Sequence, residues 1–197
     1  GFQQEGISPS VKDKIAIAKL IDSLGVSFIE GGWPGASPKE EEFFETAKRE
    51  LKLKNAKLVS FGSTRKLDLS AKDDPQVKAL VDSGTDYICI VGKSSKLHIT
   101  KALQTDVDSA IDMAVDTILY LKSKGKKVFF DAEHFFDGYK EDSETSLKIL
   151  ESVATAGADC FIFCDTNGGT LPEEVRKILS EVIEKYPKTK FGVHFQN

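Results

Sequence analysis

Short apolar runs alternate with longer amphipathic stretches along the whole chain. Six of these runs are predicted as β-strands, because near-continuous apolar runs of this length are typical of strands buried on both faces. They cover residues 27–30, 57–61, 86–91, 127–130, 160–164 and 190–194. The stretches between them are predicted as helices, near residues 9–24, 38–52, 75–83, 106–124, 142–156 and 172–185.

The predicted helix ends carry suitable residues. Several helices are followed by a glycine that precedes a strand, a position that favours the left-handed backbone of a helix C-cap. These glycines are Gly25, Gly84, Gly125 and Gly157. The element order is one helix, five strand–helix units and a last strand, which predicts a parallel sheet in an α/β protein. No linker or low-complexity segment divides residues 1–197, so one domain is expected.

Two parallel architectures fit this order, a doubly wound open sheet and a (β/α)₈ TIM barrel. Open sheets usually carry a glycine-rich phosphate loop after the first strand, and neither G-x-G-x-x-G nor G-x-x-x-x-G-K-[ST] occurs here. Barrel enzymes instead draw polar residues from the ends of many strands, and polar residues follow almost every predicted strand. We therefore expect residues 1–197 to be part of a catalytic barrel domain, with strands 2–7 visible and strands 1 and 8 missing.

Composition removes several classes of protein. Of the 197 residues 40% are apolar, and the formal net charge is −4. A strongly basic nucleic-acid face is not expected at this charge, and no apolar run is long enough for a membrane span. Cys89, Cys160 and Cys164 lie in apolar runs, which predicts buried free thiols in a reducing compartment.

The sequence Asp131-Ala-Glu133-His134 ends one predicted strand. Asp131 and Glu133 are two residues apart, so both side chains point to one face. They suit acid–base work, metal support or substrate binding, and the alternative is a network that ties the strand to its loop. Because unused inward carboxylates are costly, we favour function and count Asp131 as a candidate substrate-binding residue. For His134 a structural role is as plausible as a chemical one.

Other polar residues lie at further strand ends. His194 and Gln196 share a face of the last strand; imidazole is a natural metal ligand, whereas a neutral amide is a poor one. A lone histidine is nonetheless more often structural. Thr166, in a glycine-containing loop, suits a bound carboxylate or phosphate, and a plain turn is the alternative. His98 is a candidate for substrate contact or a loop histidine.

Five segments resemble a known family. Residues 1–6 (GFQQEG) resemble the end of the D-x-T-L-R-D-G-x-Q signature of the α-isopropylmalate, homocitrate and citramalate synthases. The other four resemble the citramalate synthase branch in particular. They are residues 29–35 (IEGGWPG), 61–65 (FGSTR), 130–140 (FDAEHFFDGYK) and 164–172 (CDTNGGTLP).

The resemblance implies a barrel of the HMG-CoA lyase-like superfamily that condenses acetyl-CoA with an α-keto acid. In the citramalate branch this acid is pyruvate, the product is (R)-citramalate and the pathway leads to isoleucine. A divalent cation (Mg, Mn or Zn) polarises the ketone. By position, His194 and Gln196 would be metal ligands, Glu133 would be catalytic, Thr166 would bind the keto-acid carboxylate, and Gln3 would lie near the keto acid.

The same resemblance implies a cytoplasmic enzyme that is a homodimer at full length. Its helical subdomain and C-terminal regulatory domain would lie outside this chain, which we expect to be inactive alone. A 2-isopropylmalate or homocitrate synthase, a metal-dependent HMG-CoA lyase or aldolase, and a catalytically silent barrel remain alternatives. The silent barrel is supported only by Gln196, which stands where the family has a second metal-binding histidine.

Gln196→His is expected to tighten divalent-metal binding, because an imidazole replaces a neutral amide at a ligand position. Titration calorimetry of both proteins with the same metal measures the change. Equal affinities would show that Gln196 does not occupy a ligand position.

Overall fold

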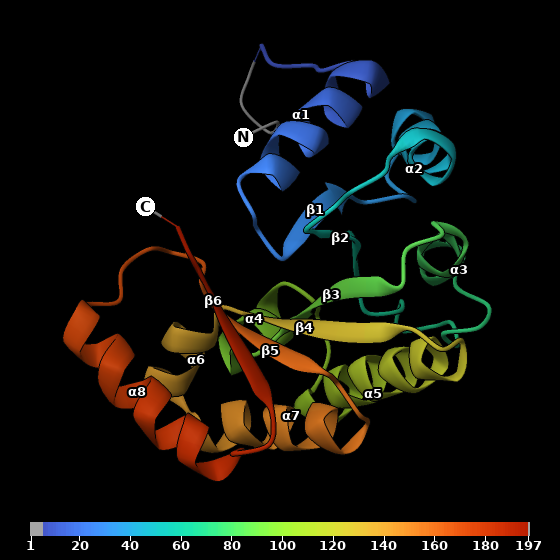
Figure 1. The fold of residues 1–197 in the computed structure, drawn as a ribbon. Coiled ribbons are helices and arrows are strands. Elements are labelled where there is room, and N and C mark those ends of the chain that lie inside the picture. The colour runs from blue at the N-terminus through green and yellow to red at the C-terminus, as the bar shows by residue number, and fades with distance from the viewer. Residues whose placement is uncertain (1–5, 197) are drawn as a thin grey trace.

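The computed structural model describes residues 6–196, in which one or two helices separate consecutive strands (Figure 1). The strands are β1 (Phe28–Gly32), β2 (Lys57–Ser63), β3 (Tyr87–Lys93), β4 (Lys127–Glu133), β5 (Cys160–Asp165) and β6 (Lys190–Phe195). The helices are α1 (Val11–Ser23), α2 (Pro38–Glu50), α3 (Pro75–Asp82), α4 (Lys96–Lys101), α5 (Val107–Ser123), α6 (Phe135–Glu141), α7 (Ser143–Thr155) and α8 (Pro172–Lys185).

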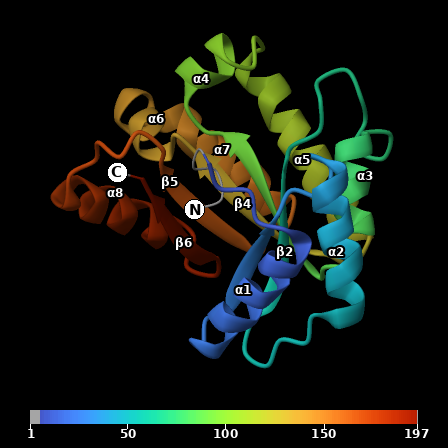
Figure 2. The ribbon, with the colours of Figure 1, turned by 90° about the horizontal axis from the view of Figure 1, so that it is seen from above.

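The strands form one curled parallel sheet. They pair in chain order, from β1 to β6, and every pairing is parallel. Figures 1 and 2 show the helices along the convex side of the curl, with α1 beside β1 at one edge. A doubly wound sheet would carry helices on both faces, so this half-barrel confirms the barrel prediction.

Outward-facing strand residues form the main core. Ile88 and Ile90 of β3, and Phe130 of β4, are fully buried (each 0% exposed). They belong to one cluster with Ile118 of α5 and Leu150 of α7. Burial of apolar surface is the dominant favourable term in folding. It therefore fixes the strands with these residues against the helices and the residues between them on the concave side.

The predicted helix ends are confirmed, whereas the strands are longer than predicted and two short helices were missed. The glycines predicted as C-caps all have positive φ, namely Gly25 (78°), Gly84 (79°), Gly125 (74°) and Gly157 (94°). The strands run further than the apolar runs, β4 to Glu133 for example, because the parallel ladder continues through polar residues at the carboxyl end. Helices α4 and α6 were not predicted, since each spans less than two full turns and shows little periodicity.

Two further sequence predictions meet the structure. Cys89, Cys160 and Cys164 are all buried free thiols, as expected. Within residues 6–196, no helix combines the length and the apolar character needed to cross a membrane.

Neighbouring residues of α5 offer a matched test of this core. Ile118 is 0% exposed and Leu119 is 53% exposed. Ile118→Ala is expected to lower the free energy of unfolding by about 2–5 kcal/mol, because it leaves a cavity. Leu119→Ala should change it by no more than about 0.5 kcal/mol. Urea denaturation measures both, and similar losses for the two variants would contradict this packing.

Candidate active site

The carboxyl ends of the strands meet at one end of the half-barrel, which we call the mouth. There Lys93 of β3 lies opposite Glu133 of β4 in the strand register, and the two side chains form an ion pair. Their exposed fractions are 22% and 25%. Lys93 is therefore paired rather than free, and it holds the Glu133 carboxylate at the mouth.

The concave face is layered. Near the amino ends of the strands, the rings of Phe28, Tyr87 and Phe129 pack together, with centroid separations of 5.1–5.7 Å. Ionisable side chains from several strands follow nearer the mouth. They are Glu30, Cys89, Asp131, Cys164 and His194. A cavity of about 720 Å³ runs along this face and touches both layers.

Asp131 is the centre of the ionisable layer. It is 6% exposed and accepts a hydrogen bond from the Cys89 thiol at 3.2 Å. Burial raises the pKa of Asp131, an effect opposed by the Cys89 hydrogen bond and by His194. Burial, and next the charge of Asp131, also raise the pKa of Glu30. Two carboxylates crowded in this way favour an added positive charge.

A cation site is available at this point. One ligand atom each from Asp131, Cys164 and His194 lies within 4.8 Å of the other two. Carboxylate, thiolate and imidazole are ligands of divalent transition metals such as zinc, so the donor set fits such an ion. Burial, and next the charge of Asp131, raise the pKa of the Cys164 thiol well above its ordinary value, and a cation bound beside it would favour the thiolate.

Cys164 is the functional candidate that the sequence interpretation missed. The available signal was the two-residue spacing in β5, because Cys160, Ile162 and Cys164 all face the concave side. Gln196 lies just past β6, where it is exposed. Its backbone N–H donates to the backbone carbonyl of Asp165 at 3.3 Å. Its role as a ligand stays a prediction.

The loop after β5 is held by hydrogen bonds within itself and to the end of β4. The buried Asp165 carboxylate accepts hydrogen bonds from the N–H and hydroxyl of Thr170, at 3.0 and 2.9 Å. Thr166 Oγ1 accepts the N–H of His134 at 2.9 Å. The ring of His134 stacks on that of His98, with centroids 3.5 Å apart. Thr166, His134 and His98 therefore lie together, one from each of three neighbouring strand ends.

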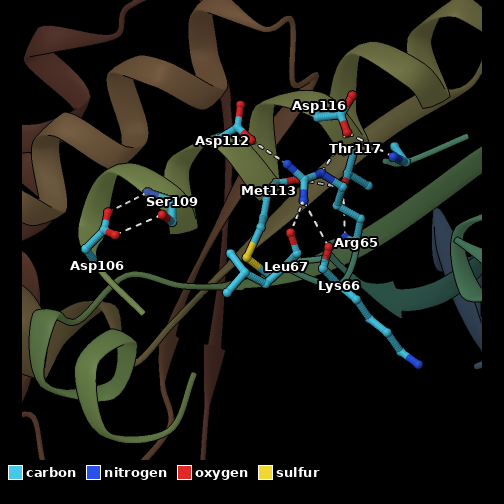
Figure 3. A network of polar contacts seen from close by, with 10 residues as sticks. Arg65, Lys66, Leu67, Asp106, Ser109, Asp112, Met113, Asp116 and Thr117 are labelled. Carbon is cyan, nitrogen blue, oxygen red and sulfur yellow. Dashed lines mark hydrogen bonds and ion pairs between the residues drawn. The ribbon is translucent and has the colours of Figure 1, made fainter. Parts of the chain in front are cut away.

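Arg65 shows how the loop after β2 is fixed (Figure 3). Its guanidinium pairs with Asp112 and Asp116 of α5 and donates to the carbonyls of Lys66 and Leu67 at 2.9 and 3.2 Å. These contacts occupy the guanidinium, so Arg65 holds the loop after β2 against α5.

Residues on either side of Arg65 line a cavity of about 520 Å³ next to Glu133. Asp112 and Asp116 are four residues apart and so lie on one face of α5. This spacing was the only sequence signal that both could pair with Arg65.

The structure thus brings Asp131 and His194 together, and sets Thr166 beside His134 and His98. Glu133 adjoins His134 in the chain and stands at the same mouth. Gln3 lies outside the described residues. The roles assigned to all of these side chains stay predictions.

A parallel half-barrel with helices on one side and ionisable groups at its strand ends is the architecture of a (β/α)-barrel enzyme domain. The chain belongs to the HMGL-like family, whose model matches residues 1–197.

Curated relatives refine this assignment. The chain is 46% identical over 197 residues to the (R)-citramalate synthase of Streptomyces coelicolor and 47% identical to that of Aquifex aeolicus. It is 30% identical to the homocitrate synthase of Sulfurisphaera tokodaii, over 100% of this chain and 41% of that protein. The match to each of the two citramalate synthases takes in 100% of this chain and spans 37% of the relative's length.

Solved structures show the same fold. The HMG-CoA lyase of Bacillus subtilis aligns with a TM-score of 0.80 at 17% identity, over 100% of this chain and 65% of that chain. An HMG-CoA lyase of Acinetobacter baumannii, solved with coenzyme A and 3-methylmalate, gives 0.77 at 19% identity, over 100% and 63%.

Glu30→Gln tests the electrostatics of the concave face in metal-free protein. A raised carboxyl pKa in the folded state costs stability as pH rises through the unfolded-state pKa, and the loss is complete above the folded-state pKa. The variant should therefore be more stable than wild type at about pH 7, with the difference vanishing below about pH 4. Urea denaturation against pH measures this. The exposed Glu50→Gln is the control, and equal pH profiles for wild type and Glu30→Gln would refute the crowding.

Proposed function

We propose that the protein containing this chain condenses acetyl-CoA with an α-keto acid, most readily pyruvate, to give (R)-citramalate and CoA. The observation that carries the proposal is the convergence of Glu133, Thr166 and the Asp131–His194 pair at one mouth. Five curated (R)-citramalate synthases, 42–47% identical over at least 92% of this chain, support it. The isoleucine pathway and the cytoplasm are proposed with it.

The reaction needs a proton removed from the acetyl methyl group. The resulting enolate carbon attacks the ketone of the keto acid, the ketone oxygen takes up a proton, and water then hydrolyses the thioester to release CoA. We assign Glu133 to organise the acetyl group for this enolisation. Its pairing with Lys93 fixes the carboxylate in place, and such positioning is a major part of catalysis.

Thr166 is assigned to the keto-acid carboxylate. Its oxygen accepts the N–H of His134, and a hydroxyl that accepts a hydrogen bond retains its own O–H to donate. Asp131, Cys164 and His194 are the residues of this chain that would hold a divalent cation. Such an ion, when bound, polarises the ketone and stabilises the developing alkoxide.

The cavity between the loop after β2 and Glu133 is proposed to receive part of acetyl-CoA. It is lined by Thr64, Lys66 and Leu103 among others, a mixture of polar and apolar side chains that suits the pantetheine arm. The structural relative from Acinetobacter baumannii carries coenzyme A together with 3-methylmalate, which favours the same pair of ligand classes here. The homodimer expected at full length stays a prediction.

Incubating the full-length protein with divalent metal, acetyl-CoA and a panel of keto acids tests the function. Pyruvate should give the fastest release of free thiol and yield citramalate by chiral chromatography. Pyruvate, 2-ketobutyrate and 2-ketoisovalerate differ by one or two carbons. Each added carbon changes the binding free energy by only about 1–3 kcal/mol. A better turnover of another keto acid would therefore reassign the substrate. Cleavage of HMG-CoA without condensation would favour a lyase, and complete inactivity would favour a silent barrel.

Glu133→Gln is expected to lower kcat about 10²–10⁴-fold, because the carboxylate loses its charge while the side-chain shape is kept. The matched control is Glu141→Gln, at an exposed position of the following helix α6. Steady-state assays of both variants measure the effect. A Glu133→Gln enzyme with wild-type kcat would remove Glu133 from the mechanism.

A further inference from the structure

His134 adopts a rare backbone conformation where β4 passes into α6. Its φ of 57° and ψ of 33° lie in the left-handed region, which crowds the Cβ atom of any residue other than glycine. Such conformations persist only where surrounding contacts enforce them, and they cluster at functional sites. His134 is 8% exposed, so its support comes from packed neighbours.

Three contacts supply that support. The His134 N–H donates to Thr166 Oγ1 at 2.9 Å, and the His134 carbonyl accepts the N–H of Gly138 at 2.9 Å. The His134 ring lies on the His98 ring, with centroids 3.5 Å apart and planes 10° from parallel. Burial, and next the proximity of His98, lower the pKa of His134. The His134 ring is therefore neutral near pH 7, which suits close stacking.

His98 is itself held in place by the helix and the loop that carry it. It lies on α4, whose next residue Ile99 is fully buried in the main core. Just before α4, Ser94 binds the Glu133 carbonyl through its hydroxyl at 2.7 Å and through its N–H at 3.0 Å. The segment after β3 therefore contacts Glu133 through Ser94 and His134 through His98.

The geometry constrains the Thr166 hydroxyl. A hydroxyl group has one donor hydrogen and two acceptor positions. The His134 N–H occupies one acceptor position, so the direction left for the O–H depends on where His134 holds its own N–H. A shift of the left-handed His134 backbone would turn the Thr166 O–H away from a bound carboxylate. Errors of about 1 Å in such positioning reduce rates strongly.

We propose that His98 is a positioning residue for the keto-acid subsite. By stacking on His134 it maintains the backbone that directs the His134 N–H to Thr166, and so it orients the Thr166 hydroxyl without touching the substrate. This differs from the direct substrate contact considered for His98 from the sequence. The inference rests on the proposed function, which supplies the role of Thr166.

Kinetics of the full-length enzyme test the stack. His98→Ala should raise KM for the keto acid about tenfold and leave KM for acetyl-CoA unchanged, which corresponds to about 1.4 kcal/mol. His98→Phe keeps a flat ring and should restore KM to within about twofold of wild type. Lys101→Ala, at an exposed position of the same helix, is the control. A Phe variant as impaired as the Ala variant would overturn the proposal, because the imidazole itself would then be needed.

A double-mutant cycle tests the route through Thr166. Thr166→Ala removes the hydroxyl on which His98 acts, so adding His98→Ala should raise KM no further. Independent, multiplying effects of the two substitutions would show that His98 does not act through Thr166.

A third readout needs no activity. Amide hydrogen exchange over residues 132–136 should be faster in His98→Ala than in wild type, and close to wild type in His98→Phe. Unchanged exchange in His98→Ala overturns the inference. Wild-type inactivity with every keto acid would instead count against the proposed function, and hydrogen exchange would still decide whether His98 holds the His134 backbone. In an active enzyme, faster exchange with unchanged KM would also overturn the positioning role.

Discussion

Burial of the outward-facing strand residues is the constraint on which the rest of the structure depends. Alternate residues of β3 and β4, such as Ile88, Ile90 and Phe130, are sealed against helices on the convex side. Because side chains alternate along a strand, this packing turns the intervening residues to the concave side. Cys89 and Asp131 are thereby placed on that face whatever their own preference for water.

The concave face therefore collects groups that would not gather unaided. Asp131 and Glu30 are crowded, and the pKa of each carboxyl is raised chiefly by burial. Cys164 and His194 join Asp131 from the next two strands. Crowded and buried carboxyl groups of this kind favour the binding of a cation. Ionisable groups with shifted pKa values are common at functional sites.

The loops around the mouth are fixed by polar and stacking contacts in addition to apolar burial. Arg65 ties the loop after β2 to α5 through Asp112 and Asp116 (Figure 3). The loops after β3, β4 and β5 are joined by the His98–His134 stack and the His134–Thr166 hydrogen bond. These contacts link segments far apart in the chain, so the positions of the candidate catalytic groups depend on one another.

The sequence by itself determined the six strands, their parallel order, the glycine C-caps and the residues at the strand ends, because these follow from local periodicity and turn chemistry. Only the tertiary structure decided that Cys164 joins Asp131 and His194, that α5 neutralises Arg65, and that His98 lies on His134. The reason is physical: these contacts join residues about 30–65 positions apart in the chain, and the curl of the sheet, which no local pattern encodes, sets their distances.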